Sequence, residues 1–231
     1  TQRFPLTVAL GQSSTVEATW DRGTQGALEY TVTTRLLSGD EVIDSLEHPL
    51  LIWRPKEQPR PITARDGDFY QGERKWYPYG VNYMPTSECG IEDGEYFEYW
   101  LDPQPYDPEV TERDLKRIAA MGMNMVSVFV YYRSIDSGNL LDLLMRCERH
   151  GLKVNLSLRP GTPLDFQWPQ MGEIITRYRL AAMDNLFVYD LAWEPAFGGY
   201  EARKHWDAAW AEWVVERYGA IENAERDWGV P

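Results

Sequence analysis

One carboxylate stands where a predicted strand ends, and its neighbours suit acid–base chemistry. The stretch VYDLAWEPAFGGY, residues 188–200, runs from an apolar strand into Glu194, a proline and two glycines. Because the residue before a proline favours extended backbone, we expect Glu194 to stay on the line of the strand instead of curling into the next helix. A carboxylate in this place is either part of a surface corner or a catalytic acid at the mouth of a barrel. The strands and helices that precede it distinguish the two possibilities.

Polar side chains also gather on one face of the preceding predicted strands. Side chains alternate across a strand, so LKVNLSLRP, residues 152–160, puts Asn155, Ser157 and Arg159 on one face and its leucines and valine on the other. The same alternation groups Ser127 with Arg133 in NMVSVFVYYR, residues 124–133. The residues expected to meet at the carboxyl ends of their strands, where barrel enzymes hold their active sites, are Asn82, Arg133, Arg159 and Glu194.

The elements that must position these residues begin near residue 75, where strands and helices alternate. Four strand candidates are each followed by a helix candidate, which implies parallel strands joined by right-handed crossovers. The strand candidates are residues 76–85, 124–133, 152–160 and 188–195, and the helix candidates are residues 107–122, 139–151, 171–183 and 200–219. Four such units form half of an eight-unit barrel or one small open sheet.

Two local patterns refine the predicted helices. Asp107 is the predicted N-cap of the first helix, with Pro108 at its first position and Gly122 near its end. Trp206, Trp210 and Trp213 recur at helical spacing in the last helix, which predicts a buried stripe on one face.

The first 65 residues have a different pattern. Three segments either alternate apolar with polar residues or are rich in β-branched residues, which is typical of strands: FPLTVAL, STVEATW and ALEYTVTTRLL. Turn-forming stretches such as DRGTQG separate them. We therefore expect a small β-sandwich over residues 1–65 that includes a proline-rich linker, RPKEQPRP, near its end. Residues 66–231 are expected to form a catalytic-type domain, the first half (about four βα units) of a TIM-type barrel, so that the fold class is α/β.

Composition and charge narrow the function classes. The net charge of -13 argues against nucleic acid and anionic membranes as partners and is compatible with a neutral substrate. No apolar run approaches the roughly 20 residues needed to span a bilayer. The 2 cysteines and 3 histidines show no ligand spacing, so we expect neither a metal site nor a cofactor. The sequence leaves a secreted or periplasmic location and a cytoplasmic one equally open.

Several motifs together resemble one group of enzymes. Four segments are similar to segments of the clan A (β/α)₈-barrel glycoside hydrolases, above all the family 42 β-galactosidases and the family 5 enzymes. These segments are GLKVNLSLRPGTPLDFQW (151–168), MGMNMVSV (121–128), AWEP (192–195) and WAEWVVERYGAIENAERDWG (210–229). GVNYMP (80–85) resembles the first barrel strand of these enzymes. The resemblance covers residues 77–231, and the order of the motifs carries it more than any single one.

The resemblance implies a retaining glycosidase that acts on β-linked sugars with two carboxylates. It assigns the general acid/base to Glu194, after the fourth strand, and a nucleophile to the end of the seventh strand, which this chain does not contain. The chain is therefore expected to be an N-terminal piece of a longer enzyme, or to pair with another half barrel or a second copy. Expected contacts to the carbohydrate substrate are Asn82, Arg133, Arg159, Trp168 and Trp193.

Two positions depart from the pattern of these enzymes. Trp193 stands where they usually have the asparagine that binds the sugar 2-hydroxyl, and Ser127 stands where they often have an arginine. Two other functions consequently stay open. One is a non-catalytic carbohydrate-binding protein derived from a hydrolase, and the other is a domain that mediates assembly through its open sheet edges.

Overall fold

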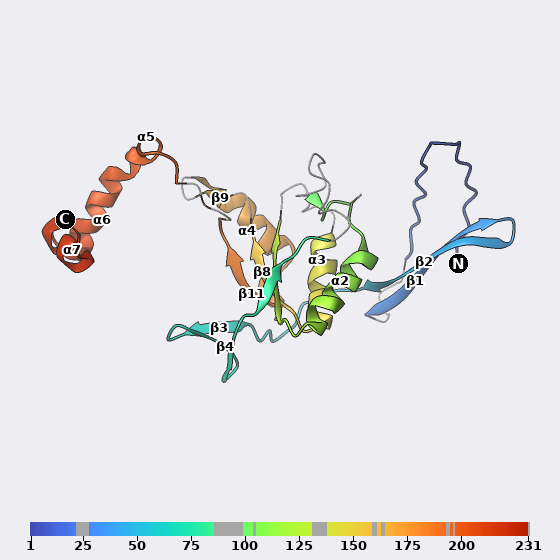
Figure 1. Ribbon diagram of the computed structural model, residues 1–231, viewed down its shortest axis with the longest axis horizontal. Helices are drawn as coiled ribbons and strands as arrows, with labels where there is room; N and C mark the ends of the chain where they lie inside the picture. The colour runs from blue at the N-terminus through green and yellow to red at the C-terminus, as the bar shows by residue number, and fades with distance from the viewer. Residues whose placement is uncertain are drawn as a thin grey trace.

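The computed structural model describes residues 1–21, 28–85, 99–103, 105–130, 138–158, 161–162, 165–192, 195 and 197–230. Its centre is a mixed α/β body with one parallel sheet, and antiparallel sheets lie beside it (Figure 1). A β-hairpin extends toward one end of the molecule and the C-terminal helices toward the other (Figure 1). Among these residues, no helix has the length and apolar character that a membrane span requires.

The four strands of the parallel sheet lie in the order in which they occur in the chain. From one edge to the other they are β6, β7, β8 and β11, and every neighbouring pair is parallel. The strands are β6 Gly80–Asn82, β7 Met125–Phe129, β8 Lys153–Ser157 and β11 Leu186–Asp190, and the connecting helices are α2 Pro108–Ala120, α3 Asn139–Arg149 and α4 Trp168–Arg177. Between β8 and β11 the chain also forms the two-residue strands β9 Gly161–Thr162 and β10 Asp165–Phe166 and the 3₁₀ helix η2 Leu180–Ala182. The predicted alternation of parallel strands and helices is confirmed for this part of the chain.

One face of this sheet packs against the helices. Val126 and Val128 of β7 and Val154 and Leu156 of β8 are fully buried in a single apolar cluster. The helices contribute to the same cluster with Leu115, Ile118, Leu140, Leu143, Leu144, Met171 and Ile174. Burial of a side chain of this size contributes about 1.5–3 kcal/mol, so this face holds the domain together.

The start of α2 follows the local sequence pattern. The Oδ1 atom of Asp107 accepts hydrogen bonds from the backbone N–H groups of Glu109 (2.9 Å) and Val110 (3.0 Å). Pro108 occupies the first helical position, where its missing N–H group costs nothing. Gly122, with φ 83°, follows the end of the helix. The predicted N-cap is therefore confirmed.

The β-sandwich expected over residues 1–65 is not confirmed. β1 Glu29–Ser38 and β2 Glu41–Leu51 form a two-stranded antiparallel hairpin, and β3 Ile62–Arg65, β4 Asp68–Gln71 and β5 Arg74–Trp76 form a separate three-stranded antiparallel sheet. Within residues 1–21 no strand is present. Leu36, Val42 and Leu46 of the hairpin stay exposed, because no second sheet of the described chain covers them.

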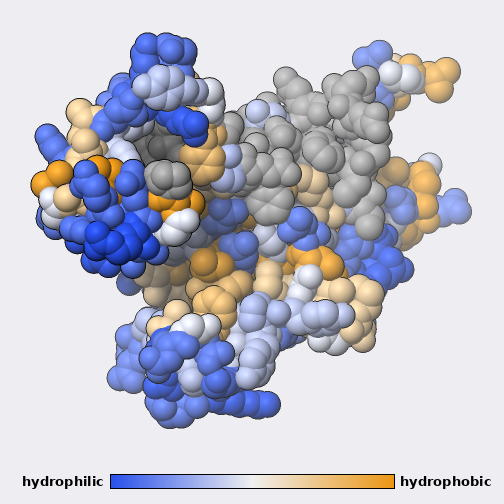
Figure 2. All heavy atoms as spheres, turned by 60° about the vertical axis from the view of Figure 1, so that its left-hand side comes forward, coloured by the Kyte–Doolittle hydropathy of each residue, from blue (hydrophilic) through white to orange (hydrophobic). Residues whose placement is uncertain are grey.

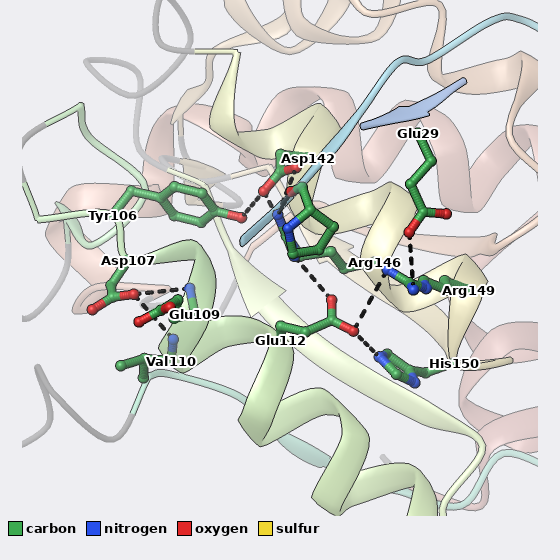
Figure 3. A network of polar contacts seen from close by, with 11 residues as sticks. Glu29, Tyr106, Asp107, Glu109, Val110, Glu112, Asp142, Arg146, Arg149 and His150 are labelled. Carbon is green, nitrogen blue, oxygen red and sulfur yellow. Dashed lines mark hydrogen bonds and ion pairs between the residues drawn. The ribbon is translucent and has the colours of Figure 1, made fainter. Parts of the chain in front are cut away.

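A buried arginine connects the hairpin to the helices (Figure 3). Arg146 of α3 donates from Nη2 to the carbonyl oxygen of Pro49 in β2 (2.7 Å), from Nη1 to Glu112 of α2 (2.9 Å) and from Nε to Asp142 (2.7 Å). Asp142 also accepts from the hydroxyl of Tyr106 at 2.6 Å. Two helices and one strand thus share a single cation.

The proline-rich segment between β2 and β3 is fastened to the body of the molecule. Lys56 forms ion pairs with Glu148 of α3 and with Asp184, which precedes β11; the Lys56–Asp184 distance is 2.8 Å. The backbone N–H group of Arg60 donates to the same Asp184 carboxylate. This segment therefore lies against the amino-terminal ends of the parallel strands instead of acting as a free spacer.

The C-terminal helices carry an apolar stripe at the surface. They are α5 Tyr200–Arg203, the 3₁₀ helix η3 Lys204–Trp206, α6 Asp207–Tyr218 and α7 Ile221–Trp228. The side chains expected to be buried, Trp206, Trp210 and Trp213, are 49%, 53% and 44% exposed, so that expectation is wrong for this structure. The indoles of Trp210 and Trp213 stack on each other at 5.1 Å instead of packing into the sheet. Figure 2, which turns this side forward, shows hydrophobic residues in orange among hydrophilic ones at the surface.

Candidate functional site on the polar face of the parallel sheet

The second face of the parallel sheet carries polar side chains, and it is called the polar face below. In register across the strands, Asn82 lies beside Ser127, and Ser127 lies beside Asn155. One row further along the strands, Phe129 lies beside Ser157, and Ser157 lies beside Asp190. Cα partners in a parallel ladder point to the same side of the sheet. The polar face therefore consists of Asn82, Ser127, Phe129, Asn155, Ser157 and Asp190, with one aliphatic member, Val188, beside Asn155.

Every strand of the sheet ends on this face. Asn82, Phe129, Ser157 and Asp190 are the last residues of β6, β7, β8 and β11. Since the strands are parallel, their carboxyl ends lie along one edge of the sheet, which is where α/β proteins bind ligands. The alternation inferred for β8, polar on one side and apolar on the other, is confirmed for Val154 to Ser157.

Hydrogen bonding on the polar face is incomplete. Asn155 Nδ2 donates to Ser127 Oγ at 3.1 Å. Asn155 Oδ1 and Ser157 Oγ are buried and have no hydrogen-bond partner in the described structure. Asp190 accepts from the N–H group of Ala192 at 3.1 Å, which turns the chain as it leaves β11. Buried polar atoms are nearly always paired, so the two unpaired oxygens mark a place where a ligand or a water molecule belongs.

The residues predicted from the sequence fall partly within the described chain. Asn82 is exposed at the end of β6, and Trp168, which is 57% exposed, begins α4. Glu194, Arg133, Arg159 and Trp193 lie outside the described residues, and their assignment stays a prediction. The alternation of side chains puts Asn155 and Ser157 on this face but does not by itself single them out as site residues. The signal that could have identified them is that this alternation puts two hydrogen-bonding side chains, an amide and a hydroxyl, next to each other on this face.

Burial raises the pKa of Tyr189 on β11, and two further ionisable groups with shifted pKa values lie at the other end of the sheet. Burial lowers the pKa of Lys153, the first residue of β8, whose Nζ donates to the carbonyl oxygen of Asp184 at 2.7 Å. Burial alone would raise the pKa of Asp184, but its hydrogen bonds with Lys56 and with the N–H group of Arg60 lower it. These groups have partners and serve the structure. No cluster of three His, Cys, Asp or Glu side chains that could hold a metal ion occurs among the described residues.

Comparison with known proteins gives one partial similarity. No family model and no curated protein sequence matches the chain. A solved structure, the exo-β-1,4-mannosidase Op5Man5 from Opitutaceae bacterium strain TAV5, aligns with 51% of this chain at 24% identity and a TM-score of 0.33. The chain spans about a quarter of that enzyme, 25% of its length. The similarity is to a glycoside hydrolase and extends no further.

Proposed function

We propose that this chain is part of a glycoside hydrolase that acts on β-linked sugars by a retaining, two-carboxylate mechanism. The observation that carries the proposal is the parallel sheet of four strands in chain order, each ending on one polar face. This order is the one expected for the first half of a (β/α)₈ barrel, which the proposal includes. The side chains of that face, amides and hydroxyls beside an aromatic ring, are the types that bind sugars.

Glu194 is the proposed general acid/base. In the sequence it follows Asp190, the last residue of β11, by four residues. A retaining glycosidase needs a second carboxylate about 5–5.5 Å from the first. We propose that Glu194 of this chain is the general acid/base and that the nucleophilic carboxylate belongs to a part of the protein outside these 231 residues.

Substrate contacts are proposed for the remaining predicted residues. The exposed indole of Trp168 can stack on a sugar ring, and Asn82 offers a free amide at the end of its strand. Arg133, Arg159 and Trp193 follow β7, β8 and β11 in the sequence, and we propose that they contact the same sugar. The proposed ligand is accordingly a neutral carbohydrate, which agrees with the net charge of -13.

The test is the substitution Glu194→Gln in the full-length protein. Loss of the general acid should lower turnover of alkyl β-glycosides about 10²- to 10⁴-fold. Dinitrophenyl β-glycosides should be cleaved with a smaller loss in the bond-breaking step, since their leaving group needs no proton. Glu201→Gln is the matched control, because Glu201 is an exposed carboxylate that pairs with Lys204 on α5 and η3. Equal rates for Glu194→Gln and the unaltered protein would refute the assignment.

A second candidate is an assembly domain. The exposed stripe of Trp206, Trp210 and Trp213 favours it, because apolar surface of this kind commonly marks a contact with another protein. Sedimentation of the full-length protein over a range of concentrations, together with the turnover assay, separates the two candidates. Concentration-dependent association without turnover of any β-glycoside would favour assembly.

A further inference from the structure

Two unpaired oxygens on the polar face point to a ligand contact. Ser157 has no exposed surface, and its Oγ finds no partner in the described structure. The Oδ1 atom of Asn155, two residues earlier on β8, is also buried and unpaired, although Nδ2 of the same amide donates to Ser127. A buried hydrogen-bonding group without a partner destabilises a protein. Two of them on adjacent positions of one face therefore indicate a constraint other than stability.

The chemistry around these atoms selects a neutral ligand with hydroxyl groups. Asn155 Oδ1 can only accept, so its partner must donate, whereas Ser157 Oγ can do either. A phosphomonoester dianion or a carboxylate has no proton to donate and would lie near Asp190, the next residue of the polar face after Ser157. Phe129 lies on the other side of Ser157 and offers an apolar surface. Neighbouring hydroxyls on a sugar ring can satisfy both oxygens, with the ring carbons against an aromatic side chain.

We infer that Asn155 and Ser157 bind hydroxyl groups of the carbohydrate substrate, an inference that rests on the proposed function and names two further contacts for it. Both oxygens are buried in the sugar-free structure, so they must become accessible when the sugar binds. The unpaired state then belongs to the sugar-free protein and ends when the sugar binds. A side chain of this kind lowers the stability of the free protein in exchange for affinity.

The test measures stability and affinity on the same variants of the full-length protein, in the Glu194→Gln background so that bound sugar is not consumed. Ser157→Ala removes the unpaired hydroxyl, and it should raise the melting temperature of the sugar-free protein by about 2 °C or more. The same variant should weaken binding of cellobiose, lactose or β-1,4-mannobiose, whichever binds, by about 3- to 10-fold in calorimetry. Asn155→Ala should weaken the same binding.

Thr111→Val is the matched control. Thr111 is fully buried on α2, and its hydroxyl is also unpaired, but it lies away from the polar face. Its removal should raise the melting temperature and leave sugar binding unchanged.

Two results would overturn the inference. Unchanged sugar affinity in Ser157→Ala would do so, and so would weaker binding together with a lower melting temperature, since the serine would then be structural. If the sugar binds and Glu194 is required for turnover while Ser157→Ala binds normally, this inference alone fails. If none of the three sugars binds and no β-glycoside is cleaved, the proposed function fails with it.

Discussion

Replacing Arg146 by methionine should remove a large part of the protein's stability. The guanidinium is 1% exposed and donates to Glu112, to both oxygens of Asp142 and to the carbonyl oxygen of Pro49. Methionine fills much of the same volume but has no donor, so two carboxylates that are only 20% and 22% exposed would lose their shared cation. Removing one partner of such a buried ion network costs about 3–5 kcal/mol.

The control lies on the same helix. Arg149 is 42% exposed and pairs with Glu29 at 3.0 Å and more distantly with Glu112 at 3.9 Å, and exposed ion pairs contribute only about 0–1 kcal/mol. Urea denaturation of Arg146→Met and Arg149→Met compares the same chemical change at a buried and an exposed site. For a chain of this size, 3–5 kcal/mol corresponds to a fall in melting temperature of about 6–20 °C. Equal losses in the two variants would refute the role given to the buried network.

Hydrogen exchange gives a second readout of the same substitution. The bond from Arg146 to Pro49 holds β2 to α3 through a buried donor. In Arg146→Met the amides of the hairpin β1–β2 should exchange faster, while those of β7 and β8 keep their protection relative to global unfolding. Uniform loss of protection throughout the molecule would show that the arginine stabilises the whole fold and not the attachment of the hairpin.

Two further predictions concern acid stability and the edge of the sheet. Burial alone would raise the pKa of Glu112, but hydrogen bonds from His150 and Arg146 lower it below its ordinary value of 4.5. The contribution of Glu112 to stability is thus present at neutral pH and is lost as the pH falls below about 4.5 through the folded-state pKa. In Glu112→Gln the melting temperature should therefore depend less steeply on pH in this acid range. An unaltered slope of melting temperature against pH would contradict this. Gly80→Ala should destabilise the protein by about 1–3 kcal/mol, because the added Cβ would lie 2.0 Å from a carbonyl oxygen of β7. The control is Gly172→Ala on α4, where a Cβ would meet nothing within 4 Å, and it should stabilise the protein by up to about 1 kcal/mol. Thermal unfolding that ranks the two variants the other way would contradict the packing of β6.

The parallel sheet could be predicted because its signals are local. The alternation of Asn155 and Ser157 with Val154 and Leu156 fixes which face of β8 is apolar, and the helices on either side show their own period and, at Asp107, their own cap. The preference of parallel βαβ units for right-handed crossovers then leaves few ways to arrange the strands. Closure into a barrel depends on strands that these four units do not include, so no local signal reports it.

The N-terminal region and the tryptophan stripe could not be predicted in the same way. β-branched alternation predicts that a segment is a strand, but it does not say whether a second sheet lies over it, and the hairpin β1–β2 has none in the described chain. The period of Trp206, Trp210 and Trp213 likewise gives one apolar face on the helix without naming what covers it. Burial is a property of pairs of elements, and a single-segment pattern shows only one member of the pair.

Buried polar groups occur at both ends of the parallel strands. At the amino ends, Lys153 donates to the carbonyl oxygen of Asp184, and the Asp184 carboxylate binds Lys56, whereas Asn185 Oδ1, just before β11, is buried and has no partner in the described structure. Toward the carboxyl ends, Asn155 and Ser157 each keep one buried oxygen unpaired. Selection for stability alone would remove such groups, because alanine at position 157 would avoid the cost of an unpaired hydroxyl. Thr111 and Asn185 show that a single unpaired oxygen also occurs away from the polar face, so the proposed sugar contact rests on the adjacency of Asn155 and Ser157 on one face and not on either oxygen alone.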